Sequence, residues 1–176
     1  MKYFYDTEFI EDGKTIDLIS IAIVCEDGRE YYAISNEFNL KKASQWVKDN
    51  VIKYLPPQKV NPMYESPSRV EASRAWKSRK QIKDDIVSFI GEDKPELWAY
   101  YADYDHVVLS QLFGTMMDLP NNFPMYTCDL KQLLDDKGNP KQNKPENEHH
   151  ALADAKWVKD VYFKLTNTPP PPQTKL

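Results

Sequence analysis

The feature that most constrains the fold is an apolar run at residues 16–25, IDLISIAIVC. β-branched side chains dominate this run, and a strand this apolar needs cover on both of its faces. One Asp-Gly pair stands before the run, at Asp12-Gly13, and another follows it, at Asp27-Gly28; both indicate tight turns. We therefore expect a central strand with antiparallel neighbours at residues 2–9 and 29–35, which together form a three-strand meander.

The rest of the chain alternates between helical and strand patterns. Residues 97–101 (LWAYY) predict a strand parallel to its sheet neighbour, because a helix precedes it. A fifth strand is expected at residues 124–130, and residues 56–75 and 136–148 are interpreted as loops. Apolar residues at helical spacing predict helices over residues 40–55, before Gly91, over 108–116 after Asp105, over 129–134 and from His149 to Leu165.

Length and composition indicate the broad class of protein. We expect one domain over residues 1–165, followed by a Pro-rich tail at residues 166–176 that is disordered. Cys25 and Cys128 are the only cysteines, which fits a reducing compartment. No stretch approaches 18 consecutive apolar residues, so we expect no membrane partner and a cytoplasmic location.

The net charge of −4 argues on its face against a nucleic-acid-binding protein. One segment departs from that balance, since residues 69–83 contain six Lys and Arg against a single acid, Glu71. A solvated helix face is the common explanation for such a run. The other explanation is contact with a phosphate backbone, with Trp76 available to stack on a base. The sequence does not favour either of these two interpretations over the other.

The predicted strand at residues 2–9 carries two acids, Asp6 and Glu8. Alternation along a strand places both side chains on one face, next to each other. Acids are depleted from strands, so the pair needs an explanation. A solvated strand edge explains an isolated D-x-E pattern best, because so short a pattern recurs by chance.

Two further acids and a histidine stand near predicted helix starts. Asp105 follows the strand at residues 97–101, Asp154 lies on the last predicted helix, and His149 precedes Asp154 by five residues. Taken singly, Asp105 is explained as a helix N-cap and His149 as a surface residue in a first turn. The carboxyl end of a strand is also where ligands bind in α/β proteins, so these residues are candidates to meet Asp6 and Glu8.

The acids suit metal-dependent cleavage of a phosphodiester, and the motifs of P-loop nucleotide hydrolysis, dinucleotide binding and α/β-hydrolase chemistry are missing. The chain has no P-loop, no G-x-G-x-x-G after a strand and no G-x-S-x-G. Four carboxylates carry about the charge that two Mg²⁺ ions cancel, which weakens the objection from net charge. Two such ions about 3.5–4 Å apart stabilise both the attacking and the leaving oxygen in phosphodiester cleavage. A neutral histidine is suited to taking a proton from the attacking water.

The order and context of these residues resemble the three motifs of the DEDD-type 3′–5′ exonucleases, in their His-containing (DEDDh) branch. The motifs are Asp6-Thr7-Glu8, Tyr104-Asp105 and the segment HHALAD from His149 to Asp154. Linking segments such as WAYYADYDHVVLSQLFG resemble the small exoribonucleases acting on polyadenylate that are called ribonuclease AS. The resemblance covers most of residues 1–165. It implies an RNase H-like fold with a five-stranded mixed sheet flanked by helices, two Mg²⁺ or Mn²⁺ ions, and release of nucleoside monophosphates from the 3′ end of single-stranded RNA.

The resemblance also implies roles for individual residues. Members of the family are often homodimers and act on polyadenylate, so the resemblance implies a homodimer and a polyadenylate substrate for this chain. The segment at residues 56–75 is longer than we expect in this family. The four metal-binding acids are matched by Asp6, Glu8, Asp105 and Asp154, and the general base by His149. For substrate binding we expect Thr7 and Phe9 beside the strand acids, and Trp76 and Arg79 in the basic segment.

Two alternatives stay open. An enzyme with the same metals could prefer DNA, because no feature of the sequence reads a 2′-hydroxyl group. A non-catalytic nucleic-acid-binding relative would keep the fold alone, although it would have no need to retain four repelling carboxylates. The base preference, the oligomeric state and the biological pathway do not follow from the residues.

Overall fold

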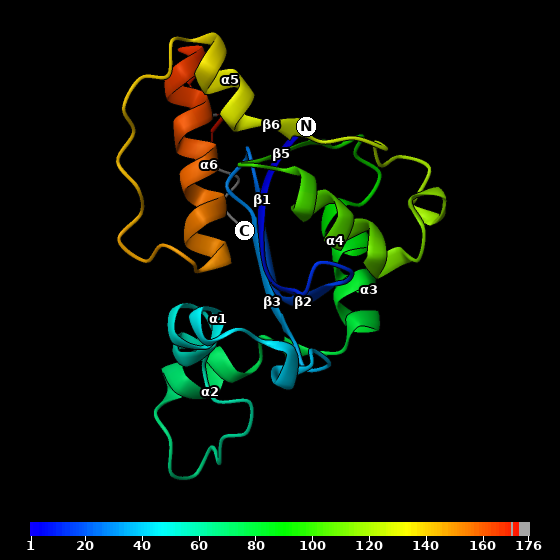
Figure 1. Cartoon of the computed structure of the whole chain (residues 1–176), viewed down its shortest axis with the longest axis vertical. Helices are drawn as coiled ribbons and strands as arrows, with labels where there is room; N and C mark the ends of the chain where they lie inside the picture. Colours follow the sequence, from blue (N-terminus) through cyan, green and yellow to red (C-terminus); the bar gives the residue numbers. More distant parts are fainter. Residues whose placement is uncertain (170, 173–176) are drawn as a thin grey trace.

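The sheet built around the apolar run is the frame of the molecule (Figure 1). In the computed structural model, which describes residues 1–169 and 171–172, six strands follow the order β4-β3-β2-β1-β5-β6. The last eight residues of β2 are buried, as cover on both faces requires. The antiparallel meander is confirmed, and so is a parallel strand next to β1, which is β5. The strands are β1 (Lys2–Glu11), β2 (Ile16–Cys25), β3 (Glu30–Ser35), β4 (Trp76–Lys77), β5 (Glu96–Ala99) and β6 (Cys128–Asp129).

Helices cover both faces of this sheet. α3 and α4 share a core cluster with Tyr3 and Tyr5 on one face, and α5 and α6 share another with Phe4 on the opposite face. The segment that contains α1 packs against Ile10 and Ile19 of the sheet, and α1 and α2 lie below α6 in Figure 1. The helices are α1 (Gln45–Asn50), α2 (Pro67–Ser73), α3 (Arg79–Ile90), α4 (Asp103–Phe113), α5 (Leu130–Asp136) and α6 (Ala151–Thr166), with 3₁₀ turns η1 (Leu40–Lys42), η2 (Ile52–Tyr54) and η3 (Met116–Asp118).

Alternation along β1 decides which side chains meet which helices. Tyr3 and Tyr5 are fully buried against α3 and α4, whereas Phe4 packs against α5 and α6. Asp6 and Glu8 follow Phe4 on the same face of the strand. The fold therefore directs two carboxylates toward the α6 side of the sheet.

The prediction of five strands was one too few. β4 adds a two-residue parallel pairing with Ile34 and Ser35 at one edge of the sheet. At the other edge, the strand predicted over residues 124–130 is limited to β6, which pairs with Trp98 and Ala99. Such short pairings depend on the neighbouring strand more than on local pattern, which is why the sequence did not reveal them. The mixed α/β class is confirmed.

The segment between β3 and β4 differs most from expectation. The helix predicted over residues 40–55 is divided into η1, α1 and η2, and the Ser44 hydroxyl caps α1 by accepting a hydrogen bond from the Val47 amide. The predicted loop at residues 56–75 contains α2, which begins at Pro67 after the N-cap Ser66. Serine followed by proline is a helix-start signal, so α2 was detectable in the sequence.

Two expectations concern the chain as a whole. α6 ends at Thr166, and residues 170 and 173–176 of the predicted disordered tail lie outside the described residues, so that expectation stays a prediction. Within residues 1–169 and 171–172, no helix is both long enough and apolar enough to cross a membrane.

Candidate active site and metal centre

Strand β1 supplies the first two acids of the site. Asp6 and Glu8 are half-buried, and they flank Thr7, which is buried. The ladder between β1 and β2 shifts register between Glu8 and Phe9. Such irregularities are common beside active sites because they re-aim a side chain. Here Phe9 lines the same cavity as the two acids.

The first turn of α6 supplies the third acid. Asp154 lies on the helix that covers this face of the sheet, and it meets Asp6 and Glu8 across about 150 residues of sequence. One carboxylate oxygen from each of the three lies within 4.8 Å of the others. Three oxygen ligands at this spacing form a group that can hold a hard divalent cation.

The fourth acid, Asp105, lies in the first turn of α4 and is 5% exposed. Its Oδ1 accepts two hydrogen bonds from Thr7, one from the amide at 2.7 Å and one from the hydroxyl at 2.6 Å. The N-cap of α4 is Ala102, so the interpretation of Asp105 as an N-cap was wrong. Thr7 ties α4 to β1 between the two strand acids.

Crowding and burial perturb all four carboxyl groups. Burial, followed by the charges of neighbouring acids, raises the pKa of Asp6 well above its ordinary value and that of Glu8 to about 8. Burial raises the pKa of Asp105 to about 7 although the bonds from Thr7 oppose it, and burial also raises the pKa of Asp154. Carboxylates held together in this way lack counter-charge.

His149 stands beside this cluster, just before α6. Its backbone has the left-handed φ of +70°, and its amide donates to Asp154 Oδ2 at 2.9 Å. α6 itself begins at Ala151 with His150 as N-cap, two residues later than predicted. The ring of Trp46 from α1 meets the His149 ring edge-on, with centroids 4.8 Å apart.

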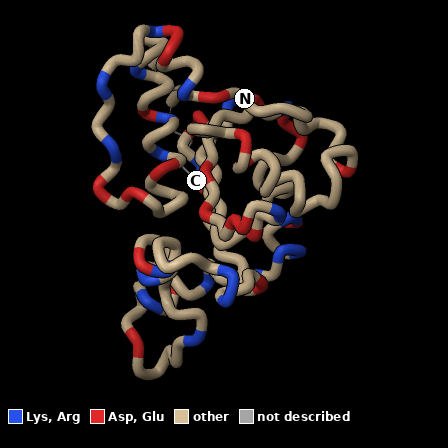
Figure 2. The backbone as a smooth tube through the Cα atoms, viewed as in Figure 1, with Lys and Arg blue, Asp and Glu red and all other residues tan. Residues whose placement is uncertain are grey.

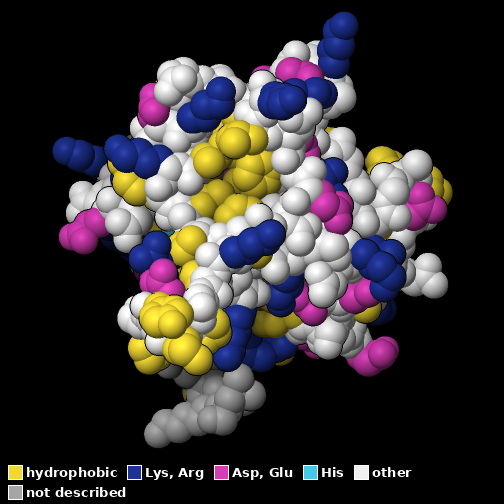
Figure 3. Space-filling view, turned by 90° about the horizontal axis from the view of Figure 1, so that it is seen from below, with side chains coloured by type: hydrophobic (Ala, Val, Ile, Leu, Met, Phe, Trp, Pro, Cys, Tyr) yellow, Lys and Arg dark blue, Asp and Glu magenta, His cyan; other side chains and the backbone are white. Residues whose placement is uncertain are grey.

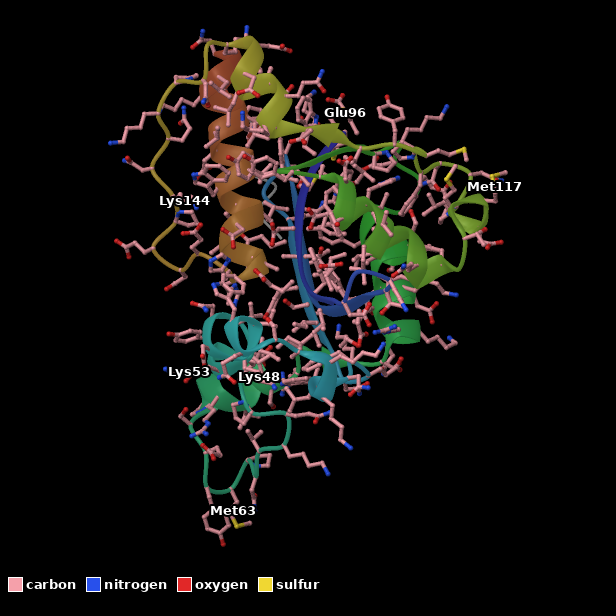
Figure 4. All side chains as sticks on the ribbon, in the orientation of Figure 1. Lys48, Lys53, Met63, Glu96, Met117 and Lys144 are labelled. Atoms are coloured by element: carbon pink, nitrogen blue, oxygen red, sulfur yellow. The ribbon has the colours of Figure 1, made fainter. Side chains whose placement is uncertain are left out.

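The acids and His149 line one cavity of about 300 Å³. Aromatic rings form much of its wall, and Phe9 stacks on Tyr104 with centroids 5.6 Å apart. Lys144, labelled in Figure 4, reaches the cavity from the loop before α6 and forms an ion pair with Glu148. From the sequence, the segment from Lys137 to Lys144 was a candidate to follow the nucleic-acid backbone, and Lys144 lines the cavity. The sequence assigned no role to the aromatic wall residues, although Tyr104 stood next to Asp105 in the motif. They are Tyr100, Tyr101, Tyr104 and Trp157.

Two residues expected to bind substrate lie elsewhere. The Trp76 indole donates to the Pro56 carbonyl at 2.9 Å and stacks on Phe38. Arg79 forms an ion pair with Asp17. Neither residue lines the cavity, so the structure does not bring them together with the acids.

Comparison with known families decides the class of protein. The sequence model of the 3′–5′ exoribonuclease Rv2179c-like domain matches residues 1–165. The chain belongs to this family. The matched range contains all four acids and His149, and membership makes the protein an enzyme of the 3′–5′ exonuclease class. The resemblance noted from the three motifs is thereby confirmed at the level of the family.

Two curated relatives agree with the family match. The 3′–5′ exoribonuclease Rv2179c of Mycobacterium tuberculosis (strain ATCC 25618 / H37Rv) is 48% identical over 172 residues, which cover 96% of this chain and 95% of the relative. The 3′–5′ exoribonuclease MT2234.1 of strain CDC 1551 / Oshkosh matches with the same figures.

Solved structures are similar in fold. Exonuclease I of E. coli, in complex with a dT13 oligonucleotide, superposes with a TM-score of 0.53 at 16% identity, covering 95% of this chain and 40% of that one. Pop2p of S. pombe, in a Mg²⁺- and Mn²⁺-bound form, has a TM-score of 0.53 at 14% identity, covering 94% and 82%. At these identities the likeness concerns the mixed α/β fold alone.

Proposed function

We propose that this protein is a metal-dependent exoribonuclease that removes nucleoside monophosphates from the 3′ end of single-stranded RNA. The observation that carries the proposal is the convergence of four acids and a histidine on one cavity. The family description and the names of the two relatives support RNA as the polymer. Polyadenylate is the candidate sequence, on the resemblance described above.

The donor set fits a pair of Mg²⁺ or Mn²⁺ ions. Asp6, Glu8 and Asp154 offer oxygens within 4.8 Å of one another, and Asp105 adds a fourth carboxylate on the same cavity. Burial raises the pKa of each of these groups, and the charges of the other acids raise those of Asp6 and Glu8 further, so bound positive charge would relieve the cluster. When bound, such ions stabilise the charge that develops on the attacking and leaving oxygens of a phosphodiester.

The protein side chains divide the remaining work. His149 takes the proton of the attacking water at an imidazole nitrogen, while its backbone amide is held by Asp154. Thr7 orients Asp105 through two hydrogen bonds. Phe9 and Tyr104 offer aromatic faces to the terminal base. A cavity of about 300 Å³ suits one terminal nucleotide, in keeping with attack at a chain end.

Several expectations from the sequence remain proposals. Trp76 and Arg79 lie outside the cavity, so any contact they make with RNA is farther along the strand. We also propose a homodimer, a cytoplasmic location and one domain over residues 1–165.

The test uses labelled single strands. RNA carrying a 5′ label should shorten one nucleotide at a time with Mg²⁺ or Mn²⁺ and stay intact with a chelator, and polyadenylate should be digested faster than mixed RNA or DNA. Asp6→Asn and Asp154→Asn should abolish digestion. Asp160→Asn, an exposed acid on the same helix as Asp154, should not. Normal digestion by either of the first two variants would remove these acids from the mechanism, and equal rates on DNA would overturn the preference for RNA.

A further inference from the structure

A second cavity lies on the other side of the α6 N-terminus. Its volume is about 630 Å³, roughly twice that of the first cavity. It lies between β3, the start of α6, η2 and the end of α2, and none of the residues assigned above to the exonuclease chemistry lines it. Its wall includes Tyr32, Tyr54, Glu71, Arg74, Lys77 and His150.

The two cavities share a wall. His149 lines the first and His150 lines the second, and the Cα atoms of adjacent residues are about 3.8 Å apart. Trp46 of α1 contacts His149, and α1 leads directly into η2, which carries Tyr54. The N-terminal end of α6 therefore separates the two cavities.

The lining of the second cavity suits a nucleotide. The rings of Tyr32 and His150 stack with centroids 4.9 Å apart, and Tyr54 is 68% exposed. Bases of any sequence stack on such rings. Among the residues that the structure describes, the Arg74 guanidinium forms an ion pair with Glu71 alone, at 2.6 Å. Both side chains are about 70% exposed, so this weak surface pair leaves Arg74 able to turn to a phosphate. The Lys77 ammonium is engaged by Asp85, so we assign it no phosphate contact.

The charge around the second cavity also suits a polyanion. Residues 38–77 contain eight Lys and Arg against three Asp and Glu, in a chain whose acids outnumber its bases by 27 to 23. Figure 2 shows Lys and Arg gathered on the α1–α2 part of the molecule. Figure 3, which views the molecule from this end, shows hydrophobic side chains in the middle of the face with Lys and Arg around them. Such a patch attracts a phosphate backbone at short range.

We propose that the second cavity binds an upstream nucleotide of the same RNA strand whose 3′ end occupies the first cavity. The base lies against Tyr54 and the Tyr32–His150 stack, and the phosphate faces Arg74. This rests on the proposed function, because it takes the strand from that site. Affinity then rises with RNA length up to the length that reaches the second cavity and is constant beyond it.

The test measures binding separately from cleavage. Fluorescence anisotropy in chelator, where hydrolysis does not proceed, gives the Kd of oligoadenylates from the dinucleotide to the decanucleotide. For the wild-type protein we expect the Kd to fall with length by about tenfold or more, the size of one stacking contact. Tyr54→Ala should lose that gain, Tyr54→Phe should keep it, and Arg74→Ala should lose part of it. Each variant is compared with its own dinucleotide Kd.

Two control variants lie on the same part of the chain but outside the cavity. Tyr64 is 80% exposed and Lys59 is exposed, and neither lines the cavity, so Tyr64→Ala and Lys59→Ala should keep the length dependence. A wild-type Kd that is independent of length overturns the proposal even if cleavage is normal. The proposal is also overturned if Tyr54→Ala keeps the dependence of Kd on RNA length but changes the mass of the oligomer in sedimentation, because this face is then a contact between copies of the protein. A third outcome also overturns the proposal. If adenosine 5′-monophosphate binds to wild type but not to Tyr54→Ala, while the dependence of Kd on RNA length is the same in both, the cavity is a site for free nucleotides and not for an upstream nucleotide of the strand. Loss of cleavage with intact length dependence counts against the proposed function alone.

Discussion

Neutralising one acid of the cluster formed by Asp6, Glu8, Asp105 and Asp154 should make the metal-free protein more stable and, if the proposed function holds, remove its activity. Glu8 is the clearest case, because burial and the charges of Asp154 and Asp105 raise its pKa from 4.5 to about 8. Between those values the folded state holds a proton that the unfolded chain has lost. The unfavourable ionisation of Glu8 is therefore absent below about pH 4.5 and grows as the pH rises to about 8. The free energy of unfolding of the metal-free protein should fall over this window.

The size of the effect follows from the same shift. A change from 4.5 to about 8 corresponds to at most roughly 5 kcal/mol, at about 1.36 kcal/mol per pH unit. Asp6 and Glu8 repel each other, so removing the Glu8 charge lets Asp6 ionise more readily and leaves a net gain of about 1–2 kcal/mol in the free energy of unfolding for Glu8→Gln. For a domain of this size that gain raises Tm by about 2–8 °C.

Thermal unfolding followed by circular dichroism, in chelator from pH 5 to pH 8, measures this gain. Glu8→Gln should melt higher than wild type at pH 8 and alike at pH 5. The matched control is Glu92→Gln, an exposed acid between α3 and β5, which should follow wild type at every pH. Added Mn²⁺ should raise the Tm of wild type more than that of Glu8→Gln. A Glu8→Gln protein that is no more stable than wild type at pH 8 would refute the account of the cluster as repelling charge awaiting metal.

Three further predictions concern catalysis. Thr7→Val keeps the hydrogen bond from the amide to Asp105 but loses the one from the hydroxyl, at 2.6 Å, so kcat should fall about 10- to 100-fold. Thr7→Ser should restore kcat. Equal kcat for the Val and Ser variants would show that Asp105 does not need the hydroxyl bond. His149→Ala should lower the single-turnover rate by about 10²- to 10⁴-fold while the Kd for RNA is unchanged, and an unaltered rate would exclude His149 as general base. Phe9→Ala removes the partner of Tyr104 and should raise the KM for RNA about 5- to 100-fold; an unchanged KM would show that the terminal base does not stack there.

Local pattern predicted the parts of the fold whose residues decide their own environment. The run at residues 16–25 can lie only inside a sheet, and alternation at residues 2–9 places Asp6 and Glu8 on one face whatever packs there. The two-residue strands β4 and β6 are different, because each exists only through pairing with a neighbour that is distant in sequence. The segment at residues 40–55 has helical spacing throughout, but its helix α1 starts only after the N-cap Ser44 and is flanked by the 3₁₀ turns η1 and η2.

The site was predictable in its acids and much less so in its surroundings. Charged pairs on a strand are conspicuous, whereas Tyr104 and Trp46 have the spacing of ordinary helix residues and reveal their place only when α4 and α1 are packed. The position of His149 also depends on tertiary contacts. A non-glycine residue at φ +70° is uncommon, and the Asp154 carboxylate that accepts its amide lies five residues later, in a helix. From the sequence, Trp76 and Arg79 were candidates to bind substrate. Their partners in the fold are distant in the chain, since the Trp76 indole donates to the Pro56 carbonyl and Arg79 pairs with Asp17.

Helix ends help to explain how the fold holds four acids close together, one of them buried and three half-buried. Asp105 lies in the first turn of α4 and Asp154 in the first turn of α6, where the partial positive charge of a helix N-terminus stabilises a carboxylate. Each of these two acids also accepts backbone hydrogen bonds, from Thr7 and from His149 respectively. Asp6 and Glu8 lie on a strand and have no helix end of their own, and the charges of the other acids raise the pKa of each. Bound cations should therefore relieve the repulsion at this strand pair.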